Sequence, residues 1–202
     1  MSLLASAIIT LAAVALWGVL HSLLAGPRTK RWVHRRLGSS ADRGYRLFYN
    51  VVAAITLLLV MAIPARNPGF TLYQIPTPWV FFTTAVQFLA ILVIGLTVLK
   101  TGAANFLGIR QLFAPEASGT ARLQVTGFYR WIRHPLYTAA LIFIWLTPVM
   151  TTSTLALYLG FTLYIVIGSQ FEERQLAAEF GQPYLEYRQK VPALIPQPWR
   201  QV

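Results

Sequence analysis

Five apolar segments constrain the fold of this chain more than any other feature. A helix crosses a bilayer with about 17–25 mostly apolar residues, and the first three segments have that length. The last two are shorter and are separated only by Thr151–Ser153, which predicts a tight helical hairpin. We therefore expect an all-α fold, a polytopic membrane helix bundle with about five transmembrane helices. The segments cover roughly residues 3–25, 47–64, 79–99, 136–150 and 153–170.

The composition favours a membrane over water as the surrounding solvent. The chain is 56% hydrophobic and 11% charged, which leaves too few polar side chains to cover a water-facing surface. The net charge of +11 would suggest nucleic acid as a partner of a soluble protein, but the basic residues lie between the apolar segments. Anionic head groups account for that placement, so we expect membrane lipid and no nucleic acid as partner. The chain has no cysteine, which excludes disulfides and thiol catalysis.

The basic residues also predict an orientation. The connections hold seven Lys and Arg in 26–46, one in 65–78, five in 100–133, none in the hairpin turn and four in 171–202. Connections that are rich in Lys and Arg remain in the cytoplasm. The alternation predicts an integral protein of a bacterial inner membrane, with its N-terminus outside and its C-terminus in the cytoplasm. The first apolar segment has no basic residue before it, so we expect a retained helix and not a signal peptide.

Two stretches are not explained as membrane-spanning segments. The connection 100–135 is long and rich in glycine, so we expect it to be folded and functional. The tail becomes polar at Glu172, and Gly181 followed by Pro183 predicts the end of one helix and the start of a short second one. We divide the chain into a three-helix membrane region, 1–99, and a region of cofactor-binding loop, hairpin and C-terminal cytoplasmic helical lid, 100–202.

The polar residues gather on both sides of the hairpin. If segments four and five pair, His134 at the entry and Glu172 at the exit must be neighbours. No metal-binding spacing, Walker loop, hydrolase elbow or dinucleotide fingerprint is present, so no metal site is expected. Arg133 has the simpler interpretation of an anchor that stays near the head groups while His134 points into a pocket. The expected cluster contains Gln124, Tyr129, Arg133, His134, Tyr137, Glu172, Glu173, Arg174, Tyr184, Tyr187 and Arg188.

Two stretches, "VTGFYRWIRHPLY" and "EERQLAAEFGQPYLEYRQKVPALIP", resemble the integral-membrane methyltransferases of the isoprenylcysteine carboxyl methyltransferase and phospholipid methyltransferase type. The resemblance covers about residues 120–197. It implies S-adenosylmethionine as cofactor, held by Gln124, Tyr129, Arg133, His134, Tyr137, Glu172, Glu173, Tyr184 and Tyr187, with Glu172, Glu173 and Arg188 as catalytic residues.

The resemblance leaves several roles open. Either Glu172 or Glu173 would hold the cofactor's ammonium group. The acceptor would be lipophilic or small and accessible from the membrane: an isoprenylcysteine-like carboxylate, a phospholipid amine or a small thiol. Phe128 stands where the family usually has proline, and Thr138 and Ala139 stand where it often has glycine. These departures affect the acceptor more than the cofactor.

The N-terminal half, "LHSLLAGPRTKRWVHRRLGSSADRGYRLFYN", is similar to the NnrU-like membrane proteins. Their relatives include a haem-containing carotene isomerase and a thiol methyltransferase. The resemblance offers an alternative function, a haem-binding isomerase or redox factor. In that alternative His21 would be a ligand of haem b, and His134 would be the candidate second ligand.

The orientation is testable with reporter fusions. Fusions after residues 40, 118 and 200 should report the cytoplasm, and a fusion near residue 72 should report the outside, because Lys and Arg retain their connections on the cytoplasmic side. An outside signal at 118 would contradict a cytoplasmic cofactor site.

Overall fold

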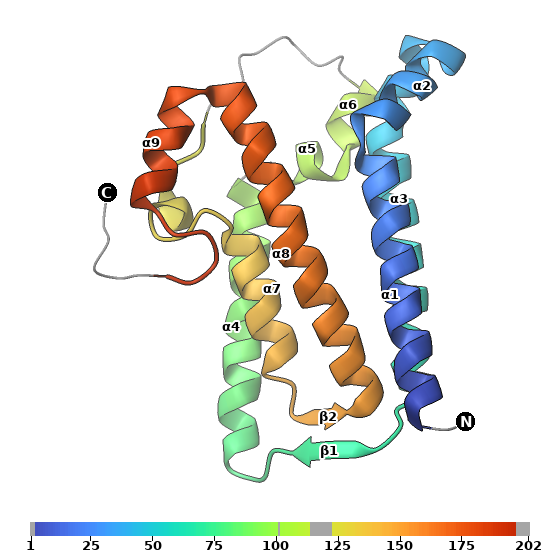
Figure 1. Cartoon of the computed structure of the whole chain (residues 1–202). Helices are drawn as coiled ribbons and strands as arrows, with labels where there is room; N and C mark the ends of the chain where they lie inside the picture. The colour runs from blue at the N-terminus through green and yellow to red at the C-terminus, as the bar shows by residue number, and fades with distance from the viewer. Residues whose placement is uncertain (1–2, 101, 114–122, 197–202) are drawn as a thin grey trace. The chain divides into compact units, whose positions relative to one another are not determined.

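The computed structural model describes residues 3–100, 102–113 and 123–196, which are almost wholly helical (Figure 1). The all-α prediction is therefore confirmed. The elements are α1 (Leu3–Ala25), α2 (Pro27–Leu37), α3 (Ser39–Arg66), β1 (Thr71–Gln74), α4 (Trp79–Lys100), α5 (Ala103–Leu107), α6 (Ile109–Phe113), the 3-10 turn η1 (Gly127–Arg130), α7 (Pro135–Trp145), β2 (Val149–Thr151), α8 (Thr152–Phe180) and α9 (Gln182–Lys190).

Four described helices are long and apolar enough to cross a membrane, namely α1, α3, α4 and α8. The chain is therefore a helical membrane protein. The predicted fourth segment forms α7, which has 11 residues and a length of about 16 Å at 1.5 Å per residue. That is about half of a bilayer core, so α7 is a short partner of α8 and not a full span.

The helices fall into two compact units, which we describe separately. The first contains α1, α2, α3, β1, α5, α6, β2 and α8 as far as Phe161. The second contains α4 as far as Thr97, η1, α7, α8 from Thr162 onward, and α9. The units interleave along the chain, and the division at residue 99 stays a prediction.

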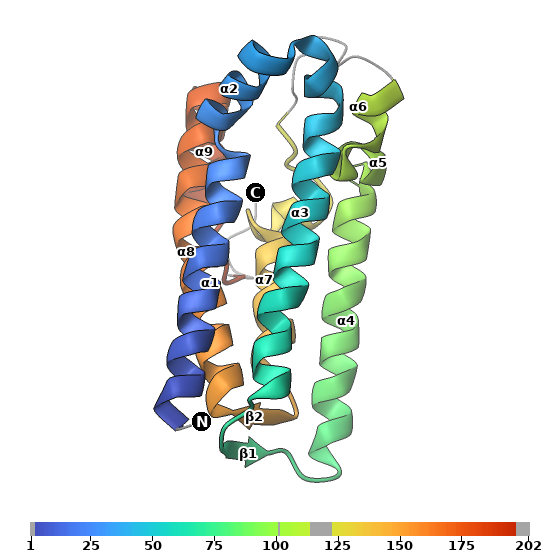
Figure 2. The ribbon, with the colours of Figure 1, turned by 90° about the vertical axis from the view of Figure 1, so that its right-hand side faces the viewer.

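The first unit is built around α1 and α3, which run side by side with α2 joining their ends (Figure 2). Val14, Val60 and Leu157 form its buried apolar cluster. Gly160 lets α8 approach α1 closely, since a Cβ at this position would lie 2.8 Å from a methyl group of Val14. The hydroxyl of Tyr45 donates to the carbonyl of Leu24 at 2.6 Å and so ties α3 to the end of α1.

Two features of this unit were not predicted. The basic stretch after α1 was expected as a connection, but it forms helix α2, because Pro27 suits a first helical turn and Arg, Lys and Leu favour helix. The strands β1 and β2 form an antiparallel ribbon, with Thr71 opposite Thr151. Their short, irregular sequences carry no alternating pattern that would have indicated a sheet.

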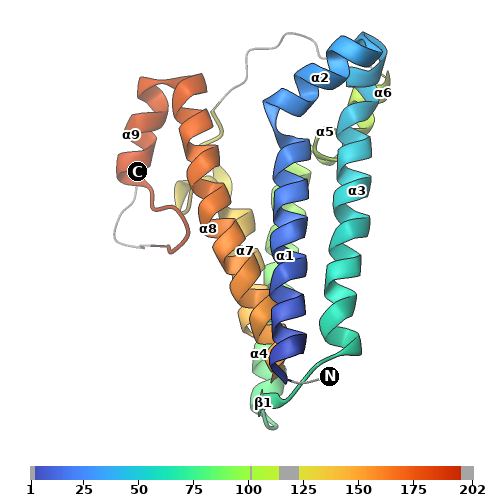
Figure 3. The same cartoon turned by 45° about the vertical axis from the view of Figure 1, so that its right-hand side comes forward.

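The second unit places the tail beside the hairpin. Helix α9 folds back along the end of α8 (Figure 3). The turn between them is at Gly181, with φ of 61°, and Pro183 lies in the first turn of α9, as predicted. Tyr184, Tyr187 and Val191 form a buried cluster against Leu176, Ala177 and Phe180 of α8. The short second helix is therefore packed and not merely solvated.

The turn between α5 and α6 supplies a test of the fold. Gly108 has φ of 86°, and a Cβ there would lie 2.6 Å from the backbone nitrogen of Leu47. Gly108→Ala should therefore destabilise the protein by about 1–3 kcal/mol, measured as thermal unfolding in detergent. Gly95→Ala is the matched control, because a Cβ at Gly95 meets no atom within 4 Å and alanine favours helix. Equal stability of the two variants would contradict the close packing of the α5–α6 turn against α3.

Candidate active site

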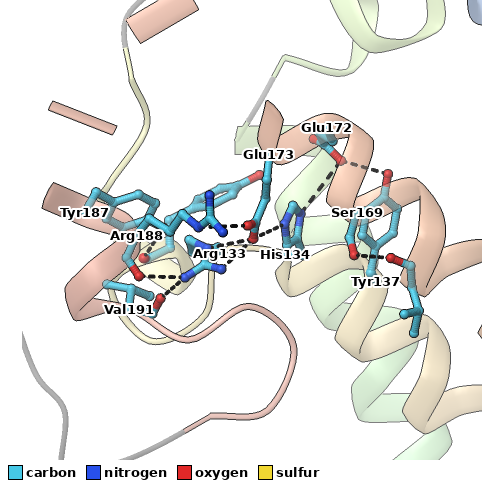
Figure 4. A network of polar contacts seen from close by, with 11 residues as sticks. Arg133, His134, Tyr137, Ser169, Glu172, Glu173, Tyr187, Arg188 and Val191 are labelled. Atoms are coloured by element: carbon cyan, nitrogen blue, oxygen red, sulfur yellow. Dashed lines mark hydrogen bonds and ion pairs between the residues drawn. The ribbon is translucent and has the colours of Figure 1, made fainter. Parts of the chain in front are cut away.

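His134 lies just before α7, in a geometry that Pro135 imposes. Its φ of −122° and ψ of 65° lie outside the helical region, which is disfavoured for the residue before a proline. The imidazole is buried. The sequence predicted an extended backbone at His134, and the observed ψ departs from the helix without reaching that range. Its Nε2 lies 3.2 Å from Oε1 of Glu173, and its Nδ1 lies 3.7 Å from Oε2 of Glu172. The hairpin entry and exit are therefore neighbours (Figure 4).

Arg133 is not an outward-facing anchor, so that expectation was wrong. Its side chain is only 10% exposed and points into the protein. Nε and Nη2 donate to Oε1 of Glu173 at 2.9 and 2.5 Å, and Nη1 donates to the carbonyls of Arg188 and Val191. The planar guanidinium fork can meet a carboxylate and two carbonyls together, and this overrides the preference of a cation for the interface.

The segment after α9 closes over the start of α7. The amides of Arg133 and His134 donate to the carbonyls of Pro192 and Ala193 at 2.9 and 3.1 Å, and the Thr138 hydroxyl donates to the carbonyl of Leu194 at 2.7 Å. Sequence reasoning missed these contacts. The signal was present in "VPALIP", because a proline-flanked extended stretch leaves its carbonyls free to accept from another segment.

The two glutamates have different surroundings, which the sequence left open. The Glu173 side chain is 9% exposed and meets Arg133 and His134. The Glu172 side chain is 45% exposed and accepts a hydrogen bond from the Tyr137 hydroxyl at 2.9 Å. The Tyr137 ring stacks on His134 with centroids 5.4 Å apart. Glu173 is therefore enclosed within the protein, while Glu172 faces solvent and can accept a ligand.

Helix α9 contributes Tyr184, Tyr187 and Arg188 to the cluster. The Tyr187 hydroxyl donates to the carbonyl of Tyr129 at 2.7 Å, and burial raises the pKa of its phenol, so it stays a donor. Burial also raises the pKa of Tyr184, whose hydroxyl is buried and has no hydrogen-bond partner among the described residues. Arg188 is half exposed, and its Nε lies 3.4 Å from Oε2 of Glu173.

Three other residues were predicted to belong to the cluster, and of these only Tyr129 has a described interaction with its members. Burial, and then the negative charge of Glu172, raises the pKa of Tyr129. The phenol of Tyr129 is therefore close enough to the cluster to interact electrostatically with Glu172. Gln124 donates to Thr126 and is exposed, and its described contacts lie outside the cluster. Arg174 lies over the ring of Phe171, on α8. In the described part of the chain, no group of three or more His, Asp or Glu could hold a metal ion.

Comparison with known proteins shows the family of the chain. The model of the NnrU protein family matches residues 9–195, nearly the whole chain. The chain belongs to the NnrU family. The resemblance of its N-terminal half to NnrU-like proteins is thereby confirmed and extends through the hairpin and the tail. No solved structure shows a significant match to the chain.

The chain is similar to several named proteins. "Methanethiol S-methyltransferase 2" of Bradyrhizobium diazoefficiens is 32% identical over 94% of this chain and 73% of the relative. "Methanethiol S-methyltransferase" of Mycobacterium tuberculosis is 29% identical over 96% of this chain and 79% of the relative. "Nurim" of Rattus norvegicus is 27% identical over 87% of this chain and 70% of the relative.

The different surroundings of the two glutamates predict different effects on stability. Glu173→Gln leaves the buried guanidinium of Arg133 without a counter-charge, and it should lower the free energy of unfolding by about 3 kcal/mol. Glu172→Gln removes the same charge from an exposed position and should change that free energy by less than about 0.5 kcal/mol. Thermal unfolding in detergent measures both. A Glu173→Gln protein as stable as the Glu172→Gln protein would contradict a structural role for the Arg133–Glu173 pair.

Proposed function

We propose that the protein transfers a methyl group from S-adenosylmethionine to a small thiol at the cytoplasmic face of the membrane. The observation that carries the proposal is the cluster around His134, which joins a solvent-facing carboxylate, a buried imidazole and an exposed guanidinium within one unit. The names of two relatives, which match this chain over at least 94% of its length, support a thiol as the acceptor.

The residues of the cluster fit the amino-acid end of this cofactor. The half-exposed Glu172 carboxylate suits an ammonium group. The side chain of Arg188 is 51% exposed, so its guanidinium can meet a carboxylate. The buried hydroxyl of Tyr184 lacks a partner among the described residues, and such a group is costly unless a ligand or water pairs with it. Glu173 is occupied by Arg133, which favours Glu172 as the partner of the ammonium.

His134 is the proposed acceptor of the thiol's proton. With Nε2 3.2 Å from Glu173, we assign the proton of the neutral ring to Nε2, which leaves a lone pair on Nδ1. Nδ1 takes the proton of the thiol, and the resulting imidazolium is flanked by Glu173 and Glu172. S-adenosylmethionine would supply a methyl group on a positively charged sulfur. Transfer to the thiolate would form a neutral thioether and release neutral S-adenosylhomocysteine, and the imidazolium would then return its proton to solvent.

The surrounding chain has a positioning role in this proposal. Arg133 donates to Glu173 and to the carbonyls of Arg188 and Val191, and so it links the start of α7 to α8 and to the end of α9. The burial of His134 excludes bulk water from the imidazole. The isoprenylcysteine carboxylate and the phospholipid amine remain alternative acceptors, and the named relatives favour the thiol over both.

The haem alternative has less support. The Nε2 of His21 lies 2.6 Å from the Tyr49 hydroxyl, and the Nε2 of His134 lies 3.2 Å from Glu173. Both imidazoles thus have partners other than a metal, and no described contact favours haem over methyl transfer. A visible spectrum of the purified protein distinguishes the two, because haem b gives a strong absorption band near 400 nm and the methyltransferase is colourless.

The test is to supply the purified full-length protein in detergent with S-adenosylmethionine and methanethiol and to measure dimethyl sulfide in the headspace. The wild-type protein should form it, and His134→Lys should reduce the rate at least about a hundredfold, because a proton acceptor and a stacked ring are lost. Glu172→Gln should weaken cofactor binding, measured by calorimetry, at least about tenfold through loss of a charge-assisted hydrogen bond.

His34→Gln is the matched control, because His34 is exposed and pairs with Asp42 between α2 and α3. It should retain the wild-type rate. Full methyl transfer by a folded His134→Lys protein would remove His134 from the mechanism. No binding of S-adenosylmethionine by the wild-type protein would overturn the proposed function itself.

A further inference from the structure

Helix α2 presents a basic surface that the proposed reaction does not use. Its sequence, PRTKRWVHRRL, contains five Arg and Lys and no acidic residue, and the helix has no buried residue. Among the described residues, no carboxylate forms an ion pair with Arg28, Arg31 or Arg35. Unpaired guanidinium groups that face outward are available to an anionic partner.

Three of these arginines share one face of the helix. Arg28, Arg31 and Arg35 follow one another at spacings of three and four residues, which places them in a row along one side. Together with Thr29 and Trp32 they line an open hollow of about 620 Å³. We call these five residues the α2 face. Trp32 is 54% exposed, so an indole lies beside the three cations.

The α2 face is held in place by contacts at both ends of the helix. The Thr29 hydroxyl donates to the carbonyl of Leu23 in α1 at 2.6 Å. At the other end, Nδ1 of His34 lies 2.6 Å from Oδ2 of Asp42 in α3. These two contacts tie α2, which carries the arginines, to α1 and α3.

The position of α2 relative to the apolar helices indicates what the face meets. The α1 span ends at Ala25, and the α3 span begins at Ala41, so α2 connects the same ends of two spans (Figure 2). It therefore starts at the boundary between the hydrocarbon and the head groups. A tryptophan at this depth is typical of the membrane interface, and guanidinium groups bind phosphate oxygens in pairs.

We propose that the α2 face is a binding site for the phosphodiester head group of an anionic phospholipid. The three arginines meet the phosphate, and the Trp32 ring lies against the glycerol and the upper acyl chain. The net positive charge of the face distinguishes an anionic lipid from a zwitterionic one, whose own cation would be repelled. The site lies in the first unit and does not depend on methyl transfer.

The experiment is a titration of the full-length protein in non-ionic detergent with phosphatidylglycerol that carries a fluorophore on one acyl chain. The combined variant Arg28→Gln, Arg31→Gln, Arg35→Gln should weaken binding at least about tenfold, because each cation near an anionic lipid contributes several-fold. The combined variant Lys30→Gln, Arg36→Gln, Arg43→Gln is the control. It removes the same three charges from positions outside the α2 face and should weaken binding less than about threefold.

Two further probes distinguish an anionic phospholipid from a zwitterionic lipid and from free phosphate. Phosphatidylcholine with the same fluorophore should bind at least about tenfold more weakly than phosphatidylglycerol, and millimolar inorganic phosphate should not displace the lipid. Equal losses in the two triple variants, equal affinity for the two lipids, or displacement by phosphate would each overturn the proposal. Thermal unfolding verifies that the variants are folded. If the first triple variant is not, the single variant Arg31→Gln takes its place, with Lys30→Gln as its control.

Discussion

The buried ion pair between Arg133 and Glu173 is the interaction on which the candidate site depends. A charge taken out of water is costly unless a partner and further hydrogen bonds compensate it. The Arg133 guanidinium meets both requirements, since it contacts the Glu173 carboxylate and the carbonyls of Arg188 and Val191. One side chain thereby joins the entry of the hairpin, the exit of the hairpin and the end of α9. The same pair leaves Glu173 placed to orient His134.

This arrangement assigns different tasks to adjacent carboxylates. Glu173 is enclosed and bonded to cations of the protein, whereas Glu172, one residue earlier along the helix, meets solvent and the Tyr137 hydroxyl. Successive residues of a helix point about 100° apart, so one of two adjacent glutamates in the last third of α8 can point into the protein while the other is accessible to a ligand. In our proposal the inner carboxylate orients the proton acceptor, and the outer one receives the ammonium of the cofactor.

Much of the fold could be predicted from the sequence, because apolar length is a strong signal for helices in a membrane. The helix boundary at Gly181 and the geometry of His134 before Pro135 followed from local backbone constraints. The direction of the Arg133 side chain could not be predicted, since a cation at the end of an apolar segment suits the interface equally well. The outcome was decided by a tertiary contact with a residue forty positions away. Neither the ribbon of β1 and β2 nor the return of the tail over α7 has a periodic signal.

The central claim is that the face formed by His134, Tyr137 and Glu172 binds the cofactor. A crystal structure of the protein with S-adenosylhomocysteine tests it most directly. We predict the amino group of the ligand within hydrogen-bond distance of Glu172 and its carboxylate near Arg188 and the Tyr184 hydroxyl, with the Arg133–Glu173 pair intact. A ligand bound elsewhere, for example beside His21 and Tyr49, would contradict the account.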